Sequence, residues 1–468
     1  MSGEQPIRKR ELVTEHAFDV VVLGGGSGGY ATALRSAELG KTVALIEGDR
    51  LGGTCLHRGC VPTKALLHSA EVADVVRSAA SSGVRAELSG IDAGAMREFR
   101  EGIVAGKHRG LVGLIKARGI TVVDGFGTLL ADGSVQVGED AYRGGDVVVA
   151  TGSHSRLVPG IELGDRIVTS EGALALETVP DRAIVLGGGV IGVEFASAWR
   201  SLGAEVTIVE GLDRLVPSED EAVSTALERA FRKRGIVSRL ATTVSGAEET
   251  ENGVAVHLGD ETLEADVLLV AVGRGPVTSG FGLDEAGVAL DGGHVVVDEH
   301  CRTSVQNVWA VGDVTRGPQL AHRGFQQGIL AAEAIAGESV TPIDDRHIPR
   351  VTYSHPEVAS VGVTEAEAAA EFGADGIATN RFDLAGNARS GIIGTGGFVK
   401  VVRRVDGPVV GVHLIGDRVG ELITEGQLAV AWDAHPEDLA PLVHAHPTQS
   451  EALGEAFLAL AGKPLHSL

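Results

Sequence analysis

The chain of 468 residues contains an internal repeat, and both copies open on a glycine-rich turn. Residues 22–29 read VLGGGSGG and residues 185–192 read VLGGGVIG. When the copies are aligned without a gap, Val43 meets Val206 and Glu47 meets Glu210. Each copy therefore predicts an apolar strand, a glycine turn, a helix, a second strand and a final glutamate, which is the βαβ pattern of dinucleotide-binding folds.

Each glycine of the pattern has a physical role. The first permits the tight turn, the second lets the backbone approach a pyrophosphate at the helix N-terminus, and the third allows close packing of helix on strand. The glutamate is placed to bind ribose hydroxyls. We expect these roles for Gly24, Gly26, Gly29 and Glu47 in the first copy, and for Gly187, Gly189, Gly192 and Glu210 in the second. Glu210 favours NAD over NADP because a carboxylate repels a 2′-phosphate, although Arg214 lies close enough to weaken that preference.

Three further apolar runs predict buried parallel strands. Residues 147–152 close the first copy, residues 268–273 close the second, and residues 308–313 end on an acid that follows a strand. Ligands bind at the carboxyl ends of such strands. Asp313 is therefore predicted to bind a ribitol hydroxyl of a flavin, the alternative being a helix N-cap.

The character of the sequence changes after residue 345. A hairpin is predicted around Asp406-Gly407, followed by helices over 420–434 and 450–461, which indicates an α+β domain. The fold class is therefore α/β, with two Rossmann-like nucleotide-binding domains and a C-terminal α+β domain. The expected domain boundaries divide the chain into residues 1–152, 153–275, 276–345 and 346–468.

Cys55 and Cys60 are two of only three cysteines and are separated by four residues, just downstream of the first glycine turn. Pro62 suits the first turn of a helix, where its missing N–H costs nothing. A thiol at such a helix start is drawn toward thiolate by the helix dipole. A redox-active disulfide is the favoured interpretation, and a structural disulfide or two buried thiols are the alternatives.

Composition excludes several classes of function. The net charge of −23 argues against nucleic acid or an anionic membrane as the main partner. Two explanations of the acidity remain: it keeps an abundant enzyme soluble, or it binds a basic docking partner. No apolar run reaches 18 residues, and residues 1–16 lack the apolar core of a signal peptide. Three cysteines do not make a disulfide scaffold. We therefore expect a cytoplasmic protein.

A histidine near the C-terminus has the context of an acid–base catalyst. Residues 444–451 read HAHPTQSE, in which His446 and Glu451 can pair, with Pro447 stiffening the turn. Two alternatives remain open. The His-x-His spacing of His444 and His446 suits a metal pair, although no third ligand lies nearby, and His446 alone suits a structural surface histidine.

Taken together, the stretch Gly-Gly-Thr-Cys-x4-Cys-x-Pro-x-Lys, the two dinucleotide folds, the Val-Gly-Asp segment and the His-x-His-Pro-Thr-x-Ser-Glu ending resemble the dihydrolipoyl dehydrogenase family of flavin-dependent pyridine nucleotide–disulfide oxidoreductases. The likeness covers the chain from about residue 18. It implies FAD at the first glycine turn and NAD at the second. Residues 1–152 and 276–345 would then be the first part of the FAD-binding domain and the second part of the FAD-binding or central domain, residues 153–275 the NAD-binding domain and residues 346–468 the C-terminal α+β dimerisation domain. Cys60 would be the charge-transfer thiolate and Cys55 the thiol that exchanges with substrate.

The resemblance implies further roles. Lys64 would lie beside the flavin with Glu194 as its ion-pair partner, and His446 with Glu451 would reach the disulfide of the other subunit, which implies a homodimer with a shared active site. The further cofactor contacts that it implies are Gly53, Thr54, Thr151, Gly152, Gly273 and Ala321. His57 and Arg58 depart from the family pattern, in which asparagine often follows Cys-Leu, and they could lower a thiolate pKa or favour an acidic partner surface.

The implied activity is oxidation of dihydrolipoamide, carried by the lipoyl domain of a 2-oxo acid dehydrogenase or glycine cleavage complex, with NAD⁺ as acceptor. Two other hypotheses remain. One is an NADPH-dependent reductase of a small disulfide such as glutathione or mycothiol disulfide. The other is a docking or electron-shuttling flavoprotein that has lost disulfide chemistry.

Overall fold

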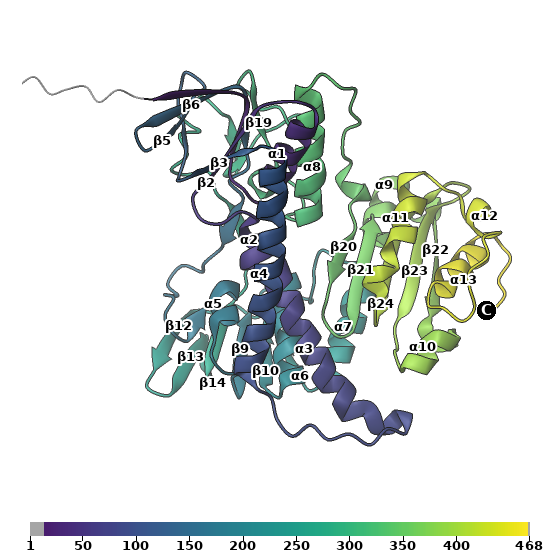
Figure 1. Cartoon of the computed structure of the whole chain (residues 1–468). Helices are drawn as coiled ribbons and strands as arrows, with labels where there is room; N and C mark the ends of the chain where they lie inside the picture. The colour runs from purple at the N-terminus through teal and green to yellow at the C-terminus, as the bar shows by residue number, and fades with distance from the viewer. Residues whose placement is uncertain (1–13, 467–468) are drawn as a thin grey trace, which may run out of the picture. The chain divides into compact units, whose positions relative to one another are not determined.

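The computed structural model describes residues 14–466 (Figure 1). The chain folds into two compact units, each assembled from three separate segments. Among the described residues, the first contains 14–57, 106–154 and 275–343, and the second contains 58–105, 155–274 and 344–466. None of the helices among residues 14–466 is long and apolar enough to cross a lipid bilayer.

The first unit is built around a sheet with the order β3-β2-β1-β6-β5-β4, in which β19 also pairs with β6. The pairs β1–β2, β1–β6, β2–β3 and β6–β19 are parallel, and the β4–β5–β6 edge is antiparallel. The strands are β1 (Glu15–Leu23), β2 (Val43–Glu47), β3 (Thr121–Asp124), β4 (Thr128–Leu129), β5 (Val135–Val137), β6 (Asp140–Val149) and β19 (Val308–Ala310).

Strand β1 shows why this sheet lies at the centre of its unit. Val20 and Val22 belong to the apolar cluster on one face of the sheet, and Val21 and Leu23 belong to the cluster on the other. All four side chains are at most 1% exposed. A continuous apolar run is what a parallel strand covered on both faces requires. Helices α1 (Ser27–Glu38) and α8 (Ala321–Ile335) pack against each other beside the sheet.

The second unit contains a wholly parallel sheet with the order β11-β10-β9-β15-β8. Its strands are β8 (Ile167–Val168), β9 (Arg182–Leu186), β10 (Glu205–Val209), β11 (Val237–Arg239) and β15 (Val267–Val270). Its helices are α5 (Ser170–Ala175), α6 (Val190–Leu202) and α7 (Glu221–Lys233). The β9-α6-β10 order repeats β1-α1-β2, so the internal repeat predicted from sequence is confirmed.

Smaller elements flank these sheets. In the second unit, a three-stranded antiparallel sheet is formed by β12 (Gly246–Thr250), β13 (Gly253–Leu258) and β14 (Glu261–Ala265). Three helices carry or follow the cysteines. They are α2 (Gly53–His57), which contains Cys55, α3 (Cys60–Ser78), which begins at Cys60, and α4 (Ala93–Ala117).

The C-terminal region is an antiparallel five-stranded sheet with helices on it, which agrees with the predicted α+β character. The order is β20-β21-β24-β23-β22, with strands β20 (Arg350–Thr352), β21 (Glu357–Gly362), β22 (Ile377–Asp383), β23 (Phe398–Arg404) and β24 (Val409–Gly416). Helix α11 (Ile423–Ala431) lies on β21 and β24, and α13 (Glu451–Leu460) lies on β22 and β23 (Figure 1). Asp406 has a φ of +53°, in the turn of the predicted hairpin. The mixed α/β fold class is confirmed.

Candidate active site

The two glycine turns have nearly identical geometry. Gly24 and Gly187 adopt φ values of +107° and +108°, which side chains disfavour. A Cβ on Gly29 would lie 1.8 Å from the Gly24 carbonyl oxygen, and one on Gly192 would lie 1.9 Å from the Gly187 oxygen. The first and third glycines of each copy are therefore required by the backbone itself.

The middle glycines face open space. A Cβ on Gly26 or on Gly189 would meet nothing within 4 Å. Each is the N-cap of its helix, α1 or α6, without a capping side chain. The backbone N–H groups at each helix start are thus presented to an open position with the positive end of the helix dipole. A nucleotide pyrophosphate fits this arrangement.

The paired glutamates also have matching contacts. Glu47 Oε2 accepts a hydrogen bond from Gly25 N–H at 2.7 Å, and Glu210 Oε2 accepts one from Gly188 N–H at 2.6 Å. Glu210 Oε1 also accepts from Leu212 N–H at 2.8 Å. Each carboxylate is thereby held at the end of its second strand, beside the glycine turn. Arg214 donates to the Pro217 carbonyl oxygen at 2.9 Å, a contact within its own loop.

The cysteine segment lies directly on the first glycine turn. A Cβ on Gly53 would lie 2.7 Å from Gly26 Cα, and Gly52 N–H donates to the Gly25 carbonyl oxygen at 2.8 Å. Gly53 begins helix α2, which contains the half-buried Thr54 and Cys55. Cys60 is the first residue of α3, and Pro62 lies in the first turn of that helix, as predicted.

His57 and Arg58, the residues that departed from the family pattern, have separate surroundings. His57 Nε2 donates to the Leu51 carbonyl oxygen at 2.9 Å, and its ring meets the His108 ring edge-on, with centroids 5.0 Å apart. Its Nδ1 is buried and has no hydrogen-bond partner among residues 14–466. Burial, His57 and Arg50 lower the pKa of His108. Arg58 lies 3.8 Å from Glu171, so its charge is partly balanced.

Lys64 forms the ion pair that the resemblance implied. Its Nζ donates to both carboxylate oxygens of Glu194 at 2.9 Å, and Glu194 is 3% exposed. Tyr353 N–H donates to Glu194 Oε1 at 2.9 Å, and its ring lies under the ammonium at 4.8 Å. Burial lowers the pKa of Lys64, but Glu194 and Cys60 outweigh it, so the pKa lies above its ordinary value. Lys64 therefore keeps its charge.

Residues at strand ends in the first unit are tied together. Asp313 Oδ2 accepts from Ser153 Oγ at 2.6 Å, and Thr151 Oγ1 donates to the Val277 carbonyl oxygen at 2.5 Å. Asp313 lies in a short 3₁₀ turn that follows β19, and Ala321 is the first residue of α8. In this turn Asp313 makes no side-chain cap, so the N-cap alternative is not what the structure shows. Gly152 and Gly273 have positive φ values of +76° and +104°.

The C-terminal histidine forms the expected dyad. His446 Nδ1 lies 2.7 Å from Glu451 Oε1, and because a carboxylate only accepts, Nδ1 carries the proton and donates. The imidazole is 71% exposed, so Nε2 is left to act on a substrate. The hydrogen bond from Thr448 N–H lowers the pKa of Glu451, which keeps it ionised.

His444 has a different partner, which bears on the metal alternative. Its Nε2 lies 2.7 Å from Glu425 Oε1 on α11, and a Cβ on Gly454 would collide with its ring at 2.6 Å. No group of three histidine, cysteine or acidic residues suited to a metal occurs within residues 14–466. The His-x-His pattern therefore reflects two histidine–carboxylate pairs.

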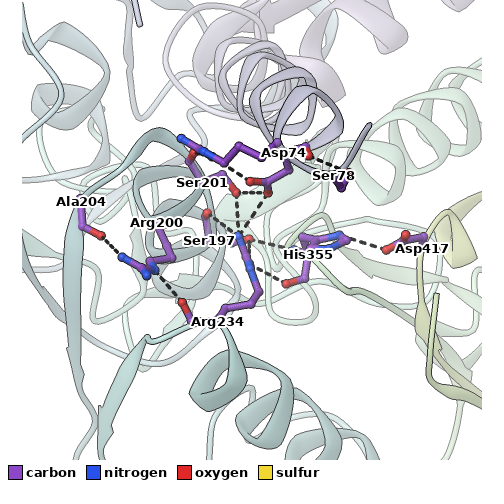
Figure 2. A network of polar contacts seen from close by, with 10 residues as sticks. Asp74, Ser78, Ser197, Arg200, Ser201, Ala204, Arg234, His355 and Asp417 are labelled. Atoms are coloured by element: carbon purple, nitrogen blue, oxygen red, sulfur yellow. Dashed lines mark hydrogen bonds and ion pairs between the residues drawn. The ribbon is translucent and has the colours of Figure 1, made fainter. Parts of the chain in front are cut away.

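Figure 2 shows a polar network that fixes helix α3, whose start carries Cys60 and Lys64. Arg234 donates to Ser197 Oγ at 2.8 Å, to Ser201 Oγ at 2.6 Å and to the His355 carbonyl oxygen at 2.6 Å. It also lies 3.6 Å from Asp74 on α3. Burial lowers the pKa of Arg234. The network joins α3, α6, the end of α7 and the loop before β21.

Two contacts of the site were not predicted. No role was predicted for Tyr353, which contacts Glu194 and Lys64, or for Asn387, which bonds to the histidine segment. Asn387 directly precedes helix α10 (Ala388–Ile393) and caps it, a role for which asparagine before a helix is a recognisable signal. Its second contact, to residue 448, has no local signal because the two residues are far apart in sequence.

Comparison with known proteins gives a family. Residues 18–328 match the family described as pyridine nucleotide-disulphide oxidoreductase, and residues 348–457 match its dimerisation domain. The mitochondrial dihydrolipoyl dehydrogenase of Pisum sativum is 39% identical over 96% of this chain and 92% of its own length. A dihydrolipoyl dehydrogenase of Bacillus subtilis is 37% identical over 96% of this chain and 99% of its own.

A solved structure agrees. LpdA of Mycobacterium tuberculosis superposes with a TM-score of 0.87 at 30% identity, covering 96% of this chain and 100% of that one. The two family matches together span both nucleotide folds and the C-terminal sheet. The chain belongs to the pyridine nucleotide–disulphide oxidoreductase family and is similar over nearly its whole length to dihydrolipoyl dehydrogenases.

Proposed function

We propose that this protein oxidises dihydrolipoamide to lipoamide with NAD⁺ as acceptor, as a homodimer. FAD and NAD are the cofactors of this family, and the dimerisation domain supports the dimer. The observation that carries the proposal is the packing of Gly53 on Gly26, which starts the cysteine segment against the first nucleotide turn. The dihydrolipoyl dehydrogenases among the relatives support the substrate.

The chain supplies the thiol chemistry and the proton transfer. His446 removes a proton from one substrate thiol, and that thiolate attacks Cys55 Sγ, which breaks the Cys55–Cys60 bond and releases Cys60 as a thiolate. The second substrate thiol then attacks the mixed disulfide. Lipoamide leaves, and the proton of the second substrate thiol passes to Cys55 Sγ, so the reduced pair holds a Cys55 thiol and a Cys60 thiolate, with the first proton on His446.

Several residues prepare these steps. Glu451 fixes the protonated nitrogen of His446, and the Lys64 ammonium provides a permanent positive charge beside the start of α3, which favours the Cys60 thiolate. FAD, when bound, carries the electron pair from the dithiol to NAD⁺. We place FAD on Gly24, Gly26, Gly29, Glu47, Asp313 and the neighbouring predicted contacts, and NAD on Gly187, Gly189, Gly192 and Glu210.

Three finer assignments belong to this proposal. The His446–Glu451 pair of one protomer serves the disulfide of the other. The substrate is presented on the lipoyl domain of a 2-oxo acid dehydrogenase or glycine cleavage complex. The chain works in the cytoplasm, as its three cysteines and its charge led us to expect.

Steady-state assays test the function. We expect NAD⁺ reduction with dihydrolipoamide, and weak or no reduction of glutathione or mycothiol disulfide by NADPH. Cys55→Ser and Cys60→Ser should each abolish dihydrolipoamide oxidation, and His446→Gln should slow it by about 10²–10⁴-fold, the usual contribution of a positioned acid–base group. All three should retain NADH oxidation by an artificial electron acceptor, which needs neither the dithiol nor the base.

Cys301→Ser is the matched control, because Cys301 is buried and belongs to the first unit's core rather than to the cysteine segment. It should retain dihydrolipoamide oxidation. Full activity of Cys55→Ser with dihydrolipoamide would refute the mechanism. A preference for glutathione or mycothiol disulfide would replace it by the reductase hypothesis.

A further inference from the structure

The proposed acid–base pair lies at the end of a segment without helix or strand. Residues 444–450 connect a turn to α13, and their conformation depends on contacts with other elements. His446 itself is largely exposed, and its imidazole is held by the hydrogen bond from Nδ1 to Glu451 Oε1. The orientation of the imidazole therefore depends on what holds residues 447–451.

Asn387 makes the contact closest to the dyad from outside its segment. Its Nδ2 donates to the Thr448 carbonyl oxygen at 2.9 Å. Thr448 N–H in turn donates to Glu451 Oε2 at 2.8 Å, and Glu451 Oε1 accepts from His446 Nδ1 at 2.7 Å. A short series of hydrogen bonds thus leads from Asn387 to the imidazole, with Thr448 held at both its carbonyl and its amide.

The amide of Asn387 is itself fixed in one orientation. Its Oδ1 accepts from both the N–H and the hydroxyl of Ser390, at 2.9 and 3.0 Å, as the N-cap of α10. Only the NH₂ group can then face Thr448. Asn387 is 5% exposed, so water does not replace a lost partner easily and an unpaired amide there is costly.

Other anchors hold the flanks of the segment rather than Thr448. Gln449 Nε2 donates to the Asp417 carbonyl oxygen at 2.9 Å, and His444 pairs with Glu425. Neither touches the residue that bonds to Glu451. Asn387 is therefore the contact whose loss should alter the dyad most selectively.

We propose that Asn387 is a positioning residue for the reaction, which sets the orientation of His446 through Thr448 and Glu451. This inference rests on the proposed role of His446 and Glu451. It predicts that loss of the Asn387 donor slows proton transfer while leaving the nucleotide sites intact.

Asn387→Ser tests it, because serine is a good N-cap and keeps the position neutral, but is too short to reach the Thr448 carbonyl. We expect kcat with dihydrolipoamide to fall about ten- to a hundredfold, as for a displaced catalytic group, with KM little changed. The acid limb of the pH–rate profile should move, and NADH oxidation by an artificial acceptor should stay at the wild-type rate.

Asn380→Ser is the matched control, because it makes the same substitution on β22, at a side chain whose Oδ1 has no hydrogen-bond partner among residues 14–466. It should retain kcat within about twofold, as a change remote from the reacting groups does. An equal loss in Asn380→Ser and Asn387→Ser would mean that the effect is not specific to the contact with Thr448, and would overturn the proposal.

A double-mutant cycle with His446→Gln decides whether Asn387 acts through the histidine. In the His446→Gln background, Asn387→Ser should cause no further loss of kcat. An undiminished further loss there, or full turnover by Asn387→Ser alone, would overturn the inference and leave the acid–base pair standing. Full turnover by His446→Gln would overturn both.

Discussion

At the scale of single residues, two opposing effects act on the pKa of Lys64: burial lowers it, and the neighbouring groups raise it. Glu194 offers two oxygens to its ammonium, and Tyr353 offers its ring face. The net effect raises the pKa of the lysine, so it stays protonated at neutral pH. A thiolate and a reduced flavin are both anions, and such a fixed cation stabilises either.

Glu210 gives a prediction about the choice of nucleotide. Glu210→Gln keeps an oxygen for the backbone N–H groups but removes the charge that repels a 2′-phosphate. We expect the ratio of kcat/KM for NADPH to that for NADH to rise about tenfold, which corresponds to about 1.4 kcal/mol. Steady-state kinetics with each nucleotide and an artificial acceptor measure it.

Glu205→Gln is the control for that change. Glu205 is the first residue of β10, the strand that Glu210 directly follows; it is exposed and pairs in the sheet through its backbone. It should leave the ratio unchanged. If Glu210→Gln also leaves it unchanged, the carboxylate does not determine the choice.

The sequence predicted residues whose partners are fixed by a local motif. Glu47 and Glu210 each bind the glycine turn of their own βαβ unit, because the unit itself brings the turn and the glutamate together. His446 and Glu451 are only five residues apart. Tyr353 and Asn387 were missed because their contacts, to Glu194 and Thr448, join residues from different elements. Only the folded chain shows such pairs.

At the scale of elements, a buried carboxylate joins the parallel sheet region to the C-terminal sheet. Asp220 caps α7 by accepting from Ala222 N–H, and it also accepts from Lys400 Nζ on β23 at 2.7 Å and from Glu365 N–H at 3.1 Å. It is 2% exposed. Burial raises its pKa, but Lys400 and the other contacts outweigh this and hold the pKa below its ordinary value.

Asp220→Asn should therefore destabilise the protein at neutral pH by about 1–3 kcal/mol, because an NH₂ group replaces one of its acceptor oxygens, while Lys400 Nζ keeps Glu365 Oε2 at 2.6 Å as a carboxylate partner. A carboxyl with a lowered pKa stabilises the fold above its unfolded-state pKa, and this contribution is lost as pH falls through the lower folded-state value. The difference in melting temperature between wild type and Asp220→Asn should thus be largest near neutral pH and shrink in acid.

Glu221→Gln is the neighbouring control, since Glu221 is exposed in the first turn of the same helix. It should change the melting temperature little at any pH. If the difference in melting temperature between wild type and Asp220→Asn were constant from neutral pH into acid, it would contradict an ionised carboxylate at this position.

Element types followed from periodicity where one pattern dominated. The βαβ repeat, the hairpin around Asp406 and the two C-terminal helices were all predicted and are confirmed. The pairing of β19 with β6 was not predicted, because pairing between distant strands leaves no periodic signal in either strand. The three-stranded sheet β12–β14 was also not predicted, although its strands are consecutive in sequence.

At the scale of the whole molecule, the proposed sharing of the active site between two protomers can be tested with a heterodimer. A heterodimer of Cys55→Ser and His446→Gln protomers combines an intact disulfide from one chain with an intact histidine from the other. If the sites are shared, one of its two sites is complete, and it should show about half of the wild-type turnover.

The two variant homodimers are the controls, and neither should oxidise dihydrolipoamide appreciably. Heterodimers purified through two different affinity tags allow the comparison. An inactive heterodimer, despite wild-type NADH oxidation by an artificial acceptor, would mean that each protomer uses its own histidine.

The order in which the segments are joined also affects biogenesis. The sheet β11-β10-β9-β15-β8 lies wholly within residues 167–270, so all of its strands leave the ribosome in one stretch. The first unit's sheet begins at residue 15 but obtains β19 only at residues 308–310. During synthesis, all strands of the second nucleotide fold are therefore present before the first fold obtains β19. Until then the N-terminal sheet is incomplete, and its unpaired strand edge would need chaperones to prevent aggregation.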